Sequence, residues 1–84
     1  RGELWQDSKL VQLTEREAEL LKALALNAGI PVSREALILD SKYGDNIRTV
    51  DVQVNRLRQK IETNPRQPRY LQTARGKGYV LRPD

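Results

Sequence analysis

Residues 48–61 constrain the fold of this chain more than any other stretch, because they predict a long helix with one apolar side. When each residue advances about 100° around a helix, four apolar residues share one side: Val50, Val54, Leu57 and Ile61. Val50, Val52 and Val54 also alternate with polar residues, which is the pattern of a half-buried strand. Only the helix brings the two later apolar residues to the same side. The stretch therefore predicts a core helix on which Val52 lies opposite the core.

Two shorter helices precede this one in the sequence. The first is predicted over residues 13–29, where Thr14 and Glu17 form a capping box and Gly29 supplies a left-handed end. Its core residues recur at helical spacing: Leu20, Leu21, Leu24 and Ala28. The second helix begins at Ser33.

The predicted helices lie between two hairpins. Short apolar segments on either side of Asp7 and Ser8 predict one strand pair, and residues 69–81 predict another around the tip at residues 76–78. The third helix is expected to be capped by Asp45 or Asn46 and to stop before Pro65. A hairpin, three helices and a second hairpin make an α+β fold with the layout of a winged helix-turn-helix.

Charge is distributed unevenly along the 84 residues. Residues 1–44 carry six basic and seven acidic side chains, whereas residues 45–84 carry nine basic and four acidic ones. Such an asymmetry indicates a polyanionic partner, with nucleic acid favoured over an anionic membrane. The alternative is a solvated basic face that has no partner.

Composition excludes several classes of protein. The chain has the length of one small domain, and it has neither cysteine nor histidine. The usual zinc sites and the nucleophile pairs that need a histidine base are therefore absent. No apolar run is long enough to span a membrane, and no signal peptide opens the chain. We expect a cytoplasmic domain that is not an enzyme and needs no metal or other cofactor.

The polar side of the long helix carries residues suited to the edges of DNA bases. Arg48, Asn55, Arg56 and Gln59 surround Val52 on the side away from the core. Arginine pairs with guanine, asparagine or glutamine pairs with adenine, and an exposed methyl group packs on the methyl of thymine. An ordinary polar face with one stray valine is the alternative.

The tip of the second hairpin is slim and basic. Arg75 stands beside Gly76 and Lys77, and the glycines remove side-chain bulk around these cations. Such a tip suits a minor groove, whose width and potential attract arginine. The alternative is an exposed turn with no ligand, because glycine and lysine are common in turns.

Four segments together resemble the C-terminal effector domain of the OmpR/PhoB family of bacterial response regulators. In chain order they are LTEREAELL (13–21), SREAL (33–37), RTVDVQVNRLRQKI (48–61) and YLQTARGKGYV (70–80). The resemblance covers about residues 3–82. It implies a winged-helix transcription factor whose third helix enters the major groove of double-stranded DNA and whose hairpin wing contacts the minor groove.

Taken with the helix and hairpin patterns, the resemblance assigns contacts residue by residue. The residues expected in the major groove are Arg48, Val52, Gln53, Asn55, Arg56 and Gln59. Those expected at phosphates are Thr49, Arg58, Lys60, Thr73 and Lys77, and Arg75 is expected in the minor groove. The loop after the second helix matches the one with which family members engage RNA polymerase: Ser41, Lys42, Tyr43, Asp45 and Asn46.

The resemblance also implies features outside this chain. Family members carry an N-terminal receiver domain that is phosphorylated through a sensor kinase, and this domain is absent here. Residues 1–84 are therefore expected to be one winged-helix domain from a longer protein, with its first hairpin the remnant of a larger sheet. Head-to-tail homodimers on direct repeats are a further implication.

The sequence thus predicts a sequence-specific DNA-binding effector domain of a two-component response regulator that controls transcription. The competing hypothesis is a winged-helix protein-interaction module, whose basic face or loop at residues 41–47 docks a protein partner. Salt dependence and sequence dependence of binding would separate the two.

Overall fold

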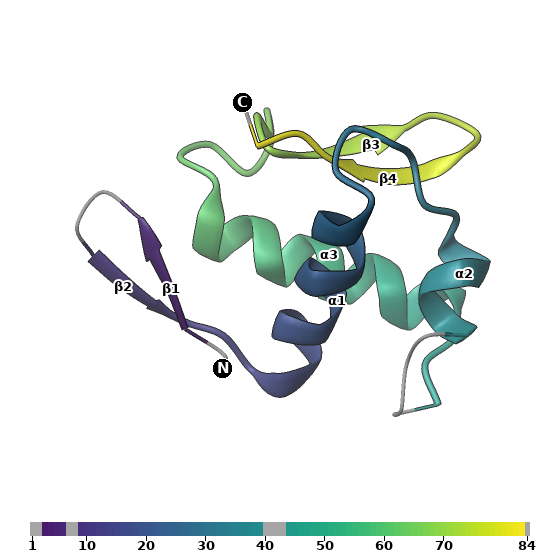
Figure 1. Ribbon diagram of the computed structural model, residues 1–84, viewed down its shortest axis with the longest axis horizontal. Helices are drawn as coiled ribbons and strands as arrows, with labels where there is room; N and C mark the ends of the chain where they lie inside the picture. The colour runs from purple at the N-terminus through teal and green to yellow at the C-terminus, as the bar shows by residue number, and fades with distance from the viewer. Residues whose placement is uncertain (1–2, 7–8, 40–43, 84) are drawn as a thin grey trace.

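The computed structural model describes residues 3–6, 9–39 and 44–83, and its element order agrees with the predicted one (Figure 1). Within these residues the elements are β1 (Glu3–Gln6), β2 (Lys9–Gln12), α1 (Glu15–Leu26), α2 (Arg34–Leu39), α3 (Ile47–Ile61), β3 (Leu71–Ala74) and β4 (Gly78–Leu81). α3 crosses the middle of the molecule, and both α1 and α2 pack against it. α1 also contacts β4. The predicted three-helix core between two hairpins is confirmed.

α1 begins as predicted but ends earlier. The Thr14 hydroxyl accepts the N–H of Glu17 at 3.1 Å, and a Glu17 carboxylate oxygen accepts the N–H of Thr14 at 2.9 Å. These two bonds complete the predicted capping box. The last helical residue is Leu26, and Asn27 leaves the helical range with φ at −118°. Ala28 is consequently exposed, so its predicted place in the core is wrong.

Polar caps begin the other two helices. Ser33 Oγ accepts the N–H of Ala36 at 3.0 Å, as predicted for the start of α2. Of the two candidates for the α3 cap, the structure selects Asn46, whose Oδ1 accepts the N–H of Thr49 at 2.9 Å. α3 then runs to Ile61 and ends before the proline that was predicted to stop it.

The apolar side of α3 forms the centre of the core. Its four predicted residues are all buried: Val50, Val54, Leu57 and Ile61. Leu24 of α1, Leu37 of α2 and Leu71 of β3 belong to the same apolar cluster. Val52 has 40% of its surface exposed, so the predicted rotation of the helix is confirmed.

The second hairpin, residues 71–81, is called the wing below. β3 and β4 are antiparallel, with Leu71 opposite Leu81, and they form a sheet separate from that of β1 and β2. Two residues of the segment that connects α1 to α2 form backbone hydrogen bonds with β4. Val32 exchanges two hydrogen bonds with Tyr79, at 2.7 and 3.0 Å, and the N–H of Gly29 donates to the carbonyl of Leu81 at 2.8 Å. The wing is therefore joined to the helical body by backbone pairing.

Gly78 makes this pairing possible. A Cβ at this position would lie 2.0 Å from the carbonyl oxygen of Val32, and the φ of Gly78 is 122°. Both the close approach and the backbone conformation require a residue without a side chain.

Candidate nucleic-acid interface

The side of α3 away from the core is exposed along the length of the helix. It carries the predicted set Arg48, Val52, Asn55, Arg56 and Gln59. These residues share one side because the four buried residues fix the rotation of the helix. The side chains are placed as the sequence predicts, and their contacts with DNA bases remain a prediction.

Gln53, which the sequence predicts in the major groove, is not on this exposed side. It is only 7% exposed and lies among side chains of α1 that include Arg16 and Glu19. On a helical projection Gln53 falls about 40° from Leu57, at the border of the apolar side. α1 packs over this border and covers it.

Arg58 is turned toward the wing rather than toward solvent. The residue is 9% exposed, and its Nε donates to the carbonyl of Leu71 at 2.9 Å. A terminal nitrogen of the guanidinium donates to Thr73 Oγ1, also at 2.9 Å. Burial lowers the pKa of Arg58, although a guanidinium keeps its charge in proteins. This side chain therefore fixes β3 to α3, which the sequence did not reveal, and its phosphate contact remains a prediction.

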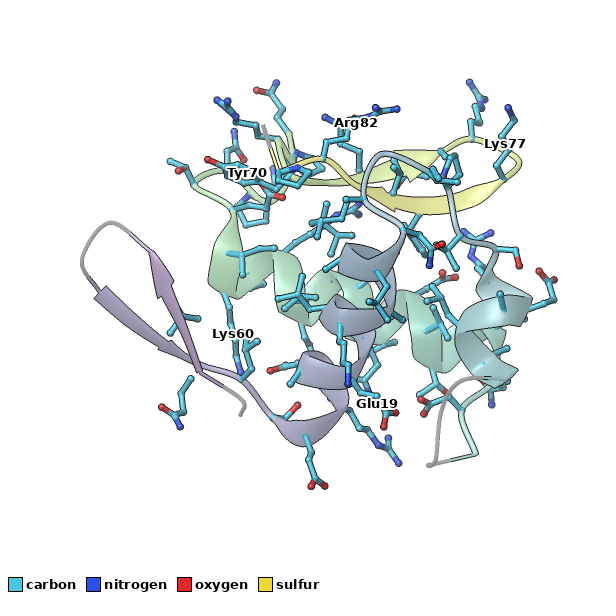
Figure 2. The ribbon with its side chains drawn as sticks, viewed as in Figure 1. Glu19, Lys60, Tyr70, Lys77 and Arg82 are labelled. Atoms are coloured by element: carbon cyan, nitrogen blue, oxygen red, sulfur yellow. The ribbon has the colours of Figure 1, made fainter. Side chains whose placement is uncertain are left out.

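Lys60 lies at the other border of the apolar side and points away from the wing. Figure 2 shows it directed toward the segment that joins β2 to α1. Its Nζ donates to Glu17 at 2.5 Å and to the carbonyl of Gln12 at 3.0 Å. Burial raises the pKa of Glu17, but the bonds from Lys60 and from the backbone of Thr14 outweigh it, and the net shift is downward. Lys60 thus holds α3 to the start of α1, and its predicted phosphate contact would have to compete with these bonds.

The hydroxyl of Thr49 is also engaged inside the protein. It donates to Asn46 Oδ1 at 2.8 Å and accepts the N–H of Asn46 at 3.4 Å. These bonds are part of the capping box that starts α3. The predicted phosphate contact of Thr49 would have to compete with this cap.

A network that the sequence did not reveal joins α2, α3 and β4. Asp51 Oδ1 accepts the Nε–H of Arg34 at 2.7 Å and the hydroxyl of Tyr79 at 2.6 Å. The guanidinium groups of Arg34 and Arg58 lie 5.3 and 5.6 Å from the centre of the Tyr79 ring. The hydrogen bond from Tyr79 is the main cause that lowers the pKa of Asp51, burial opposes it, and Arg34 lowers the pKa further. The network fixes the wing relative to α3.

The tip of the wing is exposed and basic. Arg75, Gly76 and Lys77 are all exposed, and the N–H of Lys77 donates to the carbonyl of Ala74 at 2.8 Å to close the turn. Gly76 has a φ of 73°, a left-handed conformation that suits glycine. Lys77 projects from the end of the hairpin (Figure 2). Arg75 and Lys77 are therefore available where a groove contact was predicted. Thr73, nearer the body of the domain, is exposed and holds the bond from Arg58.

The loop predicted to engage RNA polymerase is described only in part. Ser41, Lys42 and Tyr43 lie outside the described residues. Asp45 has a side chain that is 10% exposed and forms an ion pair with Arg16 of α1 at 3.5 Å. Asn46 is exposed and serves as the cap of α3.

Across residues 3–6, 9–39 and 44–83, no three acidic side chains gather in a way that could hold a metal ion. No helix in those ranges is both long enough and apolar enough to cross a bilayer.

The family defined as "transcriptional regulatory protein, C terminal" matches residues 7–81 of this chain. The chain belongs to this family. It is a winged-helix DNA-binding domain of the OmpR/PhoB type, a class of transcription-factor domain and not an enzyme. The resemblance read from the four sequence segments is thereby confirmed.

Three relatives show how this member of the family compares. PetR of Rhodobacter capsulatus is 48% identical over 94 aligned residues, which take in all of this chain and 39% of PetR. The DNA-binding domain of Klebsiella pneumoniae RstA, crystallised in complex with the RstA box, is 31% identical with a TM-score of 0.84, covering 98% of this chain and 84% of that one. The response regulator DrrB of Thermotoga maritima, an OmpR/PhoB homologue, is 38% identical with a TM-score of 0.81, covering 89% of this chain and 35% of that one. The chain thus spans about two fifths of the length of PetR.

Proposed function

We propose that this domain binds double-stranded DNA in a sequence-specific manner, with α3 in the major groove and the wing in the adjacent minor groove. The observation that carries the proposal is the free, cationic surface formed by the exposed side of α3 and the wing tip. Its cations are Arg48, Arg56, Arg75 and Lys77. Among the described residues, none forms an ion pair with these four side chains. They are available to phosphates and base edges.

The order of side chains on α3 suits base reading. Arg56 and Asn55 can donate to guanine and adenine, and Val52 between them can pack on the methyl of thymine. Gln59 adds a second amide one turn further along. In this proposal Arg48 lies in the major groove with them, Lys77 holds a phosphate, and Arg75 enters the minor groove.

The RstA complex supports the proposal. RstA shares the fold of this chain along nearly its whole length and was crystallised on its own DNA box. A domain of the same architecture is expected to dock on DNA in the same general way.

The role of the complete protein is part of the same proposal, since this chain covers about two fifths of PetR. We place the domain in a cytoplasmic two-component response regulator that controls transcription. A receiver domain would take phosphate through a sensor kinase, and the loop at residues 41–47 would engage RNA polymerase. Head-to-tail homodimers would occupy direct repeats.

The proposal is tested by measuring affinity for a duplex selected from random DNA at several salt concentrations. If about 4–6 phosphates are contacted, log K plotted against log salt should have a slope of about −3.5 to −5.5. Binding should also weaken when the selected sequence is scrambled. A slope near zero would contradict DNA binding and favour a protein-interaction module.

A further inference from the structure

An open, polar groove separates α3 from the wing. The exposed residues Asn55 and Gln59 of α3 line one wall, and Thr73 of β3 lines the other. Arg58 also lines the groove, as does Arg66 from the loop that joins α3 to β3. Arg58 and Arg66 bring positively charged N–H donors to the groove, and Thr73 brings a hydroxyl that lies next to the guanidinium of Arg58. The groove is therefore suited to an anion.

The loop that carries Arg66 is held firmly to α3. Glu62, the residue after the helix, is 7% exposed, and its carboxylate accepts the backbone N–H groups of Arg69, Tyr70 and Leu71 at 2.8, 3.0 and 2.7 Å. Within the loop, Asn64 Oδ1 accepts the N–H of Arg66 at 3.1 Å.

Two prolines, Pro65 and Pro68, restrict the backbone on either side of Arg66. The backbone at Arg66 is thus preorganised, which lowers the entropy cost of a contact made by its side chain.

Arg58 also prepares the hydroxyl of Thr73. Because a guanidinium N–H donates to Thr73 Oγ1 at 2.9 Å, the hydroxyl proton must point away from Arg58. A hydroxyl has one donor, so this orientation leaves Thr73 ready to donate to an acceptor in the groove. The two bonds made by Arg58 use two of its five N–H groups, which leaves donors for the same acceptor.

The shape of a duplex supplies such an acceptor. One sugar-phosphate strand separates the major groove from the adjacent minor groove. A domain with α3 in one and the wing tip in the other must pass that strand between them. We infer that the groove between α3 and β3 seats a phosphate of this strand, and that Arg66 provides a charge contact to it. The inference rests on the proposed function. Thr73 and Arg58 were already expected at phosphates, and the inference adds that Arg66 contacts the same phosphate as Thr73.

The test compares Arg66→Gln with Arg69→Gln. Arg69 is a matched control because it belongs to the same loop and is exposed, but its guanidinium lies 5.2 Å from the centre of the Tyr70 ring and does not line the groove. Loss of one phosphate contact should make the salt slope shallower by about 0.9, which is about an eightfold loss of affinity at 0.1 M salt that vanishes toward 1 M. Arg69→Gln should change the slope less. Both variants should melt like the unaltered domain.

A second measurement locates the phosphate. Single phosphates of the selected duplex are replaced by neutral methylphosphonates, and binding is measured for each. At one position, between the major-groove and minor-groove contacts, the replacement should weaken binding by the unaltered domain and by Thr73→Ser. The same replacement should cause little further loss of affinity in Arg66→Gln or Thr73→Val, which already lack the contact. If the Arg66 and Thr73 variants lose their sensitivity at different phosphates, the two residues do not contact the same phosphate and the inference is wrong.

The proposed DNA binding and the proposed phosphate contact of Arg66 fail in different measurements. If the unaltered domain shows neither sequence preference nor salt dependence, the proposed function itself fails. If it shows both, and Arg66→Gln behaves like Arg69→Gln, only the phosphate seat is overturned.

Discussion

Arg56 and Arg58 lie two positions apart on α3, yet Arg56 faces solvent and Arg58 is buried beneath the wing. They represent two regions of the molecule: the exposed side of α3, and the junction where α2, α3 and the wing meet. In the junction each arginine has an acceptor within the protein, the carbonyl of Leu71 and the hydroxyl of Thr73 for Arg58 and the carboxylate of Asp51 for Arg34. The described part of the chain offers Arg56 no such acceptor. An acceptor within reach, rather than charge alone, separates cations that support the fold from those available to DNA.

The largest effect is expected at the tightest contact of the junction. Gly78→Ala would place a Cβ 2.0 Å from the carbonyl of Val32, at a φ of 122°. The backbone must shift to relieve this contact, so the free energy of unfolding should fall by on the order of 3–5 kcal/mol. Denaturant unfolding followed by circular dichroism measures the loss.

Gly76→Ala is the matched control at the tip of the wing. Its φ is also positive, at 73°, but nothing lies within 4 Å of the added Cβ. Only the left-handed conformation then opposes alanine, at a cost of about 1–2 kcal/mol. Equal losses for the two variants would show that the contact with Val32 does not hold the wing.

The next effect separates the two arginines directly. Arg58→Ala removes charge-assisted hydrogen bonds to Leu71 and Thr73 and should lower the free energy of unfolding by about 1.5–3 kcal/mol. Arg56→Ala should change stability by about 0.5 kcal/mol or less. It should instead cost about 1–3 kcal/mol of binding and relax the preference at one base pair.

Matched and mismatched duplexes provide the readout for this pair. Lys77→Ala, at the wing tip, should weaken binding to all sequences about equally if Lys77 contacts a phosphate as proposed. If Arg56→Ala behaved in the same way, Arg56 would be a backbone contact. If it destabilised the fold as Arg58→Ala does, the division between the regions would break down.

A smaller effect should follow pH. The pKa of Asp51 is lowered in the folded state, so the stability it contributes is present above its unfolded pKa of about 3.9 and is lost as pH falls through the lower folded value. Because the side chain is 38% exposed, this contribution should be no more than about 1 kcal/mol. Asp51→Asn should therefore differ from the unaltered domain near pH 7 and approach it well below pH 4.

Tyr79→Phe sharpens this experiment. It removes the hydrogen bond that is the main cause of the lowered pKa of Asp51. The acid-side loss of stability should become shallower in this variant. An unchanged pH profile in both variants would mean that the network contributes no linked stability.

The smallest effect is expected at Val52. Val52→Ala should change the free energy of unfolding by about 0.5 kcal/mol or less, because the residue is exposed and lies opposite the core. Specific binding should lose about 0.8 kcal/mol if methyl contact with one thymine is removed. Replacing thymine by uracil, base by base, should reveal one position to which only the unaltered domain responds. If no position distinguishes the two proteins, Val52 is a surface valine without a role in readout.

Local patterns predicted the helices and the rotation of α3, because their causes are local. The caps at Thr14, Ser33 and Asn46 depend on residues three positions away. The side of Val52 follows from the spacing of its own helix. For the same reason the exposure of the residues proposed to read bases could be predicted from the sequence.

Long-range partners explain what the sequence could not reveal. Arg58 and Lys60 lie at the borders of the apolar side, where a long side chain reaches solvent or a neighbouring element with equal ease. Their acceptors are Thr73 and Glu17, which tertiary packing brings within bonding distance. The rotation of Gln53, close to Leu57, was the one available sign that it would be covered.

The backbone pairing of Val32 and Gly29 with β4 also bears on how the domain is assembled. Each pair joins residues about fifty positions apart, so a large loop must close before any of these bonds can form. Chains rich in such contacts fold more slowly than helical bundles of equal size. During synthesis, the connection between α1 and α2 is made before Tyr79 and Leu81 exist to pair with it. The helices can form early, but the core cannot close until the wing has been made.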